Sequence, residues 1–131
     1  MTYTRSQIVS ALTLLLGSRP EVLFAYVFGS ITESHSYRDV DVALYVRDLS
    51  HIPDPLQYTI TLGLEVERQI RCGVDVVLMN TAPDHLIHSI SKGEVIVNRD
   101  DDARVDFITS SWSRYFDIQG KRRQAIVDMV S

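Results

Sequence analysis

The stretch DVDVALYV, residues 39–46, constrains the fold of this chain more than any other segment. Its apolar members alternate with other side chains and are Val40, Val42, Leu44 and Val46. A two-residue period of this kind is typical of a β-strand that buries one face. Two carboxylates, Asp39 and Asp41, stand at its start and project to one common face. We therefore expect a strand over residues 40–46 that begins with two like charges side by side.

Length and composition indicate one globular domain spanning residues 1–131. A chain of 131 residues with 45% hydrophobic residues is long enough and apolar enough to bury a core. The net charge is −4, from 13 basic and 17 acidic residues. Broad nucleic-acid binding usually requires a basic face, so we expect no direct contact with nucleic acid.

The cysteine content and the apolar runs predict a cytoplasmic protein. Cys72 is the single cysteine, so an internal disulfide is impossible and a reducing compartment is expected. The first ten residues, MTYTRSQIVS, lack the apolar region of a signal peptide. No apolar run approaches the roughly 18 residues that a membrane span requires. We therefore expect no association with membranes.

Helical and strand patterns alternate along the chain. Thr4 and Gln7 have the spacing of a capping box, which predicts a helix over residues 5–16. Further helices are predicted over residues 56–71, in a short segment beginning at Pro83, over about 15 residues after Asp100–Asp102, and over residues 121–130 after Gly120. The other predicted strands are residues 22–28, 74–79 and 94–98. This order predicts an α/β or α+β domain with a small mixed sheet of about four strands flanked by helices.

The two predicted C-terminal helices, from about residue 102, carry an aromatic and apolar stripe. Its members are Val105, Ile108, Trp112, Tyr115 and Phe116, which recur at helical spacing. We expect most of this stripe to pack in the core and part of it to be available to a partner protein.

The two carboxylates at the start of the central strand suggest a metal site. Asp39 and Asp41 repel each other, and one would tend to hold a proton unless a cation lies between them. Mg²⁺ suits such a pair because it prefers oxygen ligands. Asp75 opens the next predicted strand and would stand beside the pair if the two strands are neighbours. Three carboxylates at adjacent strand ends can hold one or two metal ions for in-line displacement at phosphorus.

A Gly-Ser pair ends the strand at residues 22–28. Gly29 allows a sharp turn and close backbone approach to a ligand, and Ser30 adds a hydroxyl donor. Each signal alone has a plainer explanation, because Gly29-Ser30 could be an ordinary turn and Asp75 an edge-strand acid. Together with Asp39 and Asp41 they predict a phosphate cradle facing a metal-binding carboxylate pair.

This combination resembles the minimal nucleotidyltransferases of the DNA polymerase β superfamily. Their motif is a strand that ends in Gly-Ser, a loop, Asp-x-Asp at the start of the next strand, and a third acid on a later strand. Here the motif is matched by Phe28-Gly29-Ser30, by Asp39-Val40-Asp41 and by Asp75 as the candidate third acid.

The resemblance extends into the second half of the chain. Residues 74–83, Leu86 and residues 93–97 are similar to the antitoxin branch of the family, often called MntA. The resemblance therefore covers about residues 20–118 and implies the nucleotidyltransferase fold.

The resemblance implies a role for each residue of the motif. Gly29 and Ser30 would hold the triphosphate of ATP. Asp39 and Asp41 would bind two Mg²⁺ ions, and Asp75 would help to bind the second ion and accept the proton of the attacking hydroxyl. For the MntA branch it implies an antitoxin that transfers AMP to a tyrosine of a HEPN-domain toxin. Such an enzyme would form a hetero-oligomer with the toxin.

Two alternative functions stay open at this stage. Eight residues, Ile31 to Arg38, separate Ser30 from Asp39, whereas family members typically carry a longer loop. A shortened loop is compatible with a catalytically weak or inactive antitoxin that neutralises its partner by binding. The second alternative is a nucleotidyltransferase acting on a small molecule such as an aminoglycoside. Those enzymes usually carry a second helical domain, for which the roughly thirty residues after residue 100 are too few.

Overall fold

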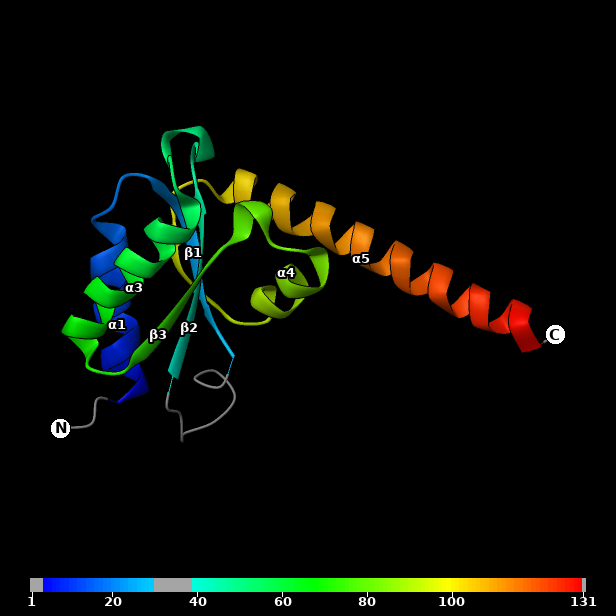
Figure 1. Ribbon diagram of the computed structural model, residues 1–131, viewed down its shortest axis with the longest axis horizontal. Coiled ribbons are helices and arrows are strands. Elements are labelled where there is room, and N and C mark those ends of the chain that lie inside the picture. The colour runs from blue at the N-terminus through cyan, green and yellow to red at the C-terminus, as the bar shows by residue number, and fades with distance from the viewer. Residues whose placement is uncertain (1–3, 30–38, 131) are drawn as a thin grey trace.

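Four strands form one mixed sheet in the computed structural model, which describes residues 4–29 and 39–130 (Figure 1). The strands are β1 (Val22–Phe28), β2 (Asp39–Val46), β3 (Gly73–Leu78) and β4 (Glu94–Asn98), and their order in the sheet is β3-β2-β1-β4. β1 pairs antiparallel with both β2 and β4, whereas β2 and β3 are parallel. The prediction of a mixed four-stranded sheet is confirmed.

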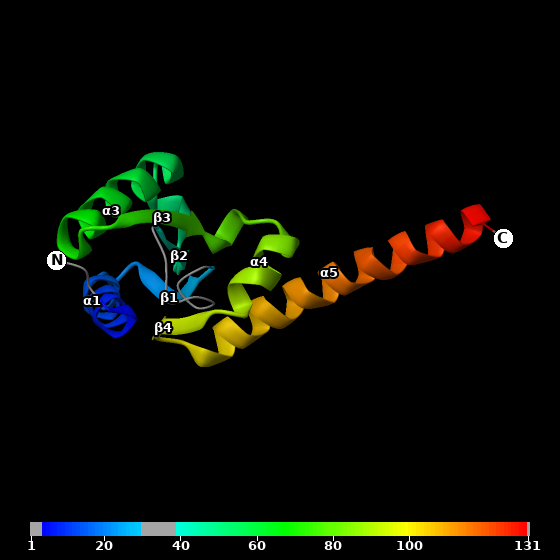
Figure 2. The same cartoon turned by 90° about the horizontal axis from the view of Figure 1, so that it is seen from below.

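Helices cover both faces of this sheet. The helices are α1 (Arg5–Gly17), α3 (Pro55–Ile70), α4 (Asp84–Ser91) and α5 (Asp101–Val130), with 3₁₀ turns η1 (Leu49–His51) and η2 (Met79–Thr81) between them. α1 and α3 lie on one side of the sheet, and α4 and α5 lie on the other (Figure 2). The expected α+β architecture, a sheet flanked by helices, is therefore present.

The first helix begins where the sequence predicts it. The Thr4 hydroxyl accepts a hydrogen bond from the backbone N–H of Gln7, and the Gln7 side chain accepts one from the N–H of Thr4. This capping box satisfies two backbone donors that the first turn of the helix leaves free. α1 then buries Ile8, Leu12 and Leu16 against the sheet.

Each face of the sheet has its own core. The α1–α3 face buries the alternating residues of β2 together with Leu62, Val66 and Ile70 of α3. The α4–α5 face buries Phe24, Tyr26, Ala43, Met79, Ile87 and Ile90. Full burial of a large aliphatic side chain contributes roughly 1.5–3 kcal/mol, so these two layers supply most of the stabilisation of the fold.

Two predicted helix boundaries differ from the structure. α3 ends at Ile70, and the residue that turns the chain is Arg71, which takes the left-handed conformation with φ 56°. The sequence predicts this helix over residues 56–71, so its observed end lies one residue earlier, and Gly73 is the first residue of β3. Pro83 precedes α4 as its N-cap instead of forming its first residue.

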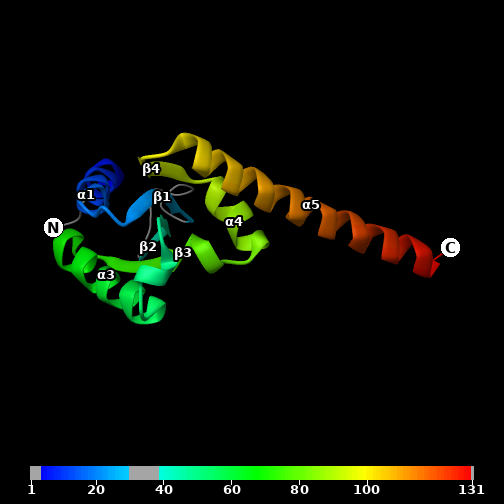
Figure 3. The same ribbon diagram turned by 90° about the horizontal axis from the view of Figure 1, so that it is seen from above.

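The C-terminal part of the chain differs most from the prediction. Residues 101–130 form the single 30-residue helix α5, whereas two helices divided at Gly120 were predicted (Figure 3). A glycine inside a helix costs only about 1 kcal/mol relative to alanine, and good helix formers around it outweigh that cost. Within the part of the chain that the structure describes, no helix is both long and apolar enough to cross a membrane.

The predicted stripe on α5 is only partly buried. Ile108, Trp112 and Tyr115 are half-buried, but Val105 and Phe116 are exposed. The prediction omitted Phe107, whose ring packs against Phe24 and Tyr45 of the sheet.

Replacing Gly120 by alanine should stabilise the C-terminal half of α5. A Cβ at this position would meet no atom within 4 Å, so the substitution costs nothing sterically. The expected gain of about 1 kcal/mol corresponds to roughly fivefold slower amide hydrogen exchange in residues 121–130. Exchange that is unchanged or faster in the Gly120→Ala variant would contradict a continuous helix.

Candidate active site

The parallel pairing of β2 with β3 brings the predicted carboxylates together. Asp41 lies directly opposite Asp75 in the register, and Asp39 lies opposite Gly73. Adjacent strands are about 4.8 Å apart, so the Asp41 and Asp75 backbones are immediate neighbours. The condition set by the sequence, that these two strands be adjacent, is met.

All three carboxylates project to the same face of the sheet. Val40 and Val42 are buried in the α1–α3 core, and so is Val74 of β3. Because side chains alternate along a strand, Asp39, Asp41 and Asp75 must point to the opposite, α4–α5 face. Asp39 and Asp75 are exposed and Asp41 is half-buried, so this end of the sheet is accessible to a ligand.

The electrostatics of Asp41 fit a cation-binding group. Partial burial raises the pKa of Asp41, and the nearby charges of Asp75 and then Asp39 raise it further. The folded protein therefore holds three carboxylates at the cost of mutual repulsion. A bound cation would relieve this repulsion.

Gly29 shapes the space beside Asp41. Its φ of +78° lies in the region that favours glycine. A Cβ built on Gly29 would overlap Oδ2 of Asp41, so any other residue would displace that carboxylate. Gly29 thus has a conformational and a steric reason to be glycine. Ser30 and the loop from Ile31 to Arg38 lie outside the described residues.

Two residues near the carboxylates were not identified from the sequence. Glu67 of α3 accepts a hydrogen bond from the backbone N–H of Val74 at 2.9 Å, which anchors β3 next to Asp75. Cys72 is half-buried, and the pKa of its thiol is raised by burial and by the charges of Asp39 and Glu67. Only the fold brings these residues to the carboxylates, because nothing in the spacing of Glu67 marks it as a contact of β3.

The carboxylates could bind a metal ion whose remaining ligands come from a substrate. Within residues 4–29 and 39–130, no three His, Cys, Asp or Glu side chains are grouped closely enough to ligate one ion by themselves. Mg²⁺ usually takes one or two carboxylates and completes its shell with water and phosphate oxygens. The donor set of Asp39, Asp41 and Asp75 therefore fits Mg²⁺ carried with a nucleotide.

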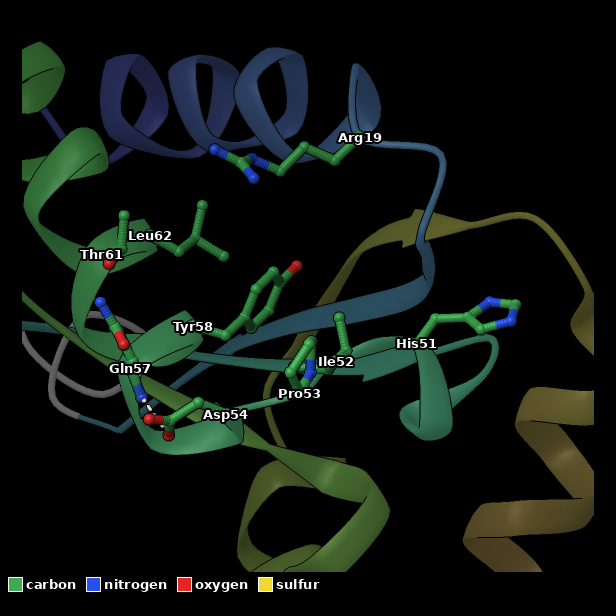
Figure 4. Close-up of a pocket in the computed structure, with 9 residues that line it drawn as sticks. All are labelled: Arg19, His51, Ile52, Pro53, Asp54, Gln57, Tyr58, Thr61 and Leu62. Carbon is green, nitrogen blue, oxygen red and sulfur yellow. Dashed lines mark hydrogen bonds between the residues drawn. The ribbon is translucent and has the colours of Figure 1, made fainter.

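A separate hollow of about 410 Å³ lies at the other end of β2 (Figure 4). The Tyr58 hydroxyl donates to Glu21 at 2.7 Å, and Arg19 forms ion pairs with Glu21 and Glu65. Burial and the Glu21 carboxylate both raise the pKa of Tyr58, so its hydroxyl stays protonated. Since these polar groups already bind one another, the hollow offers a ligand fewer polar contacts than the carboxylate end of the sheet does.

A family comparison covers most of the chain. The sequence model described as "Polymerase beta, Nucleotidyltransferase" matches residues 11–102. The chain belongs to this nucleotidyltransferase family. The matched range contains Gly29, Ser30 and the three carboxylates. A search of curated proteins finds no significant match.

Solved structures show that the nucleotidyltransferase fold extends over nearly the whole chain. One similar chain comes from the tri-AMPylated Shewanella oneidensis HEPN toxin in complex with MNT antitoxin, with 21% identity, a TM-score of 0.73, and coverage of 97% of this chain and 99% of that chain. A second comes from a toxin–antitoxin structure with AMP-PNP, with 22% identity, a TM-score of 0.73, and coverage of 94% and 98%. A third comes from the toxin–antitoxin MntA-HepT, with 20% identity, a TM-score of 0.66, and 97% coverage of each chain.

Replacing Asp41 by asparagine should stabilise the metal-free nucleotidyltransferase. The folded state raises the Asp41 pKa, so ionisation of Asp41 lowers stability as the pH rises above its unfolded value of about 3.9. At pH 7 the neutral amide removes this penalty, and Tm should rise by a few degrees, since about 1 kcal/mol shifts Tm by roughly 4 °C. Near pH 3 the wild-type carboxyl is already neutral and the two proteins should melt alike.

The matched control for that measurement is Asp106→Asn on the exposed side of α5. Its Tm should follow that of the wild type at both pH values in chelator. An Asp41→Asn protein that melts below the wild type at pH 7 would show that the carboxylates are not repelling one another.

Replacing Gly29 by alanine should destabilise the fold and displace Asp41. The positive φ alone costs of order 1–3 kcal/mol for a residue with a Cβ. Gly17→Ala is the control, since a Cβ there meets nothing within 4 Å. In an Asp41→Ala background the cost of Gly29→Ala should shrink, because the clashing carboxylate is gone. Additive effects on Tm would contradict the predicted contact.

Proposed function

We propose that this protein is a Mg²⁺-dependent adenylyltransferase that acts as the antitoxin of a HEPN/MNT pair. It would transfer AMP from ATP to a tyrosine hydroxyl of a HEPN-domain toxin. The observation that carries the proposal is the register that sets Asp41 beside Asp75, with Asp39 on the same face. The similar chains support the choice of acceptor and donor, since they come from complexes with a tri-AMPylated HEPN toxin and with AMP-PNP.

Asp39 and Asp41 would hold Mg²⁺ on the open face of the sheet, with Asp75 contributing to a second ion. When bound, Mg²⁺ neutralises the charge that develops on the phosphate oxygens during displacement. The half-burial of Asp41 supports this role, because partial exclusion of water strengthens its attraction to a cation.

Asp75 is the proposed acceptor of the proton in the transfer step. The tyrosine oxygen would attack the α-phosphorus of ATP, and the bond from that phosphorus to the pyrophosphate oxygen would break. The proton of the hydroxyl would pass to Asp75, which is exposed and therefore reachable by a group on another protein. The products are an adenylylated tyrosine and pyrophosphate.

The end of β1 would receive the triphosphate. Gly29 has no side chain between its backbone and the Asp41 carboxylate, so phosphate oxygens and their metal could approach closely. Ser30 would add a hydroxyl donor, as the family motif implies. We place the reaction in the cytoplasm, where ATP is abundant and the lone Cys72 stays reduced.

The shape of the C-terminal region is compatible with a protein acceptor. Residues 101–130 form one extended helix, which offers a long surface to another protein. An antitoxin that neutralises its partner by binding alone would share this shape, so activity must distinguish the two.

Transfer of labelled AMP tests the proposal directly. The protein is incubated with Mg²⁺, ATP labelled on the α-phosphate, and the HEPN-domain protein encoded by the neighbouring reading frame. Label should move onto the HEPN-domain protein, and Asp41→Asn should reduce the rate by about a hundred- to a thousandfold, because charge stabilisation at phosphorus is lost. Label on the γ-phosphate should not transfer.

The control variant is again Asp106→Asn, which should transfer label at the wild-type rate. Chelation of Mg²⁺ should stop transfer by both proteins. A stable complex without any transfer of label would replace adenylyl transfer with neutralisation by binding.

A further inference from the structure

The inner face of α5 continues as an exposed apolar stripe beyond the body of the protein. Along the body, this face carries Ile108, Ser111 and Tyr115, which pack toward α4 and the sheet. Steps of three and four residues lead from Tyr115 to Ile118, Arg122, Ala125, Ile126 and Met129, so these residues share the same face. Ile118, Ile126 and Met129 are 47%, 61% and 83% exposed. The face that is buried in the first half of the helix is therefore bare in the second half.

Polar contacts between α4 and α5 fix the direction in which residues 118–130 leave the body of the protein. The Asp84 carboxylate of α4 accepts hydrogen bonds from Ser111 at 2.7 Å and from two nitrogens of Arg114, each at 3.0 Å. The His88 ring stacks on Tyr115 with centroids 4.4 Å apart. A groove of about 430 Å³ opens beside Asp84, where Pro83 and His85 face Ile118 and Arg122.

The bare segment, residues 118–130, extends from the catalytic side of the molecule. α4 and α5 cover the face of the sheet to which the three carboxylates point. Figures 1 to 3 show α5 running away from the body on this side. At 1.5 Å per residue, the segment is about 20 Å long. A protein bound along its inner face would therefore lie on the same side of the sheet as the carboxylates.

The charges of the segment indicate what binds there. Lys121, Arg122 and Arg123 lie at the middle of residues 118–130, in a protein whose net charge is −4. If two copies paired antiparallel along this stripe, the basic triplets would face each other, and such like-charge contacts are unfavourable. An apolar surface flanked by acidic side chains is complementary in both respects.

We propose that residues 118–130 of α5 are the docking arm for the acceptor protein, which covers the stripe with an apolar helix face flanked by acidic residues. The proposal rests on the proposed function for the identity of that acceptor. The docking arm contributes the binding affinity for the acceptor, and the carboxylates contribute to the transfer of AMP.

Binding is measured by calorimetry with the HEPN-domain protein encoded by the neighbouring reading frame. All proteins carry Asp41→Asn, so that no transfer accompanies binding. Ile126→Asp should raise Kd at least about tenfold, because it places a charge in an apolar contact near the interface centre. The matched control is Val127→Asp, since Val127 has similar exposure and lies about 100° around the helix from Ile126, away from the stripe. That variant should change Kd less than about twofold.

Equal effects of the two substitutions, or no effect of Ile126→Asp, would overturn the docking arm. Light scattering measures the oligomeric state and so tests whether a second copy of this chain covers the stripe instead. A wild-type dimer that Ile126→Asp converts to a monomer would assign the stripe to that second copy. Circular dichroism checks that each variant remains helical.

Label transfer with Asp41 restored separates docking from catalysis. Ile126→Asp should raise KM for the HEPN-domain protein about tenfold and leave kcat unchanged. A loss confined to kcat would overturn the docking role. Binding that depends on Ile126, without transfer by the wild type, would support the arm and refute adenylyl transfer.

Discussion

The parallel pairing of β2 with β3 is the contact on which the candidate site depends. α3 carries the chain from the end of β2 back to the start of β3, so that both strands begin at the same end of the sheet. Asp41 and Asp75 then occupy adjacent positions, and their repulsion contributes to the raised pKa of Asp41. The opposite face of the same strands is fully apolar, and its burial offsets the electrostatic cost. The carboxylates thus interrupt the hydrophobic pattern of these strands, and the surrounding core compensates for the stability that this interruption costs.

The two faces of the sheet have different roles. The α1–α3 face is closed, with the alternating residues of β2 buried under Leu12, Leu62 and Val66. The α4–α5 face is packed only in part, because the carboxylates occupy its end beside Gly29. Stability and chemistry therefore come from opposite sides of the same strands.

α5 joins the face of the sheet that bears the three carboxylates to the exposed C-terminal segment. Its first half is held to α4 by Asp84, which binds Ser111 and Arg114. The face that is buried beside α4 continues into residues 118–130, where it carries Ile118, Ile126 and Met129 together with Arg122. Because the helix is continuous through Gly120, a protein bound to the outer segment would be held at a defined position relative to the carboxylates. In the proposed complex, a single continuous helix would both bind the acceptor and orient it.

The sequence by itself determined the strands, the start of the first helix, and the residues of the candidate site. Alternation in DVDVALYV, the capping box at Thr4, and the Asp-x-Asp pair are local signals, and local physics is enough to interpret them. Only the tertiary structure decided that Asp75 lies beside Asp41, that Glu67 anchors β3, and that α5 does not break at Gly120. These outcomes depend on strand order, on side-chain contacts between distant segments, and on the sum of helix propensities over 30 residues. None of those is encoded in the spacing of a short motif.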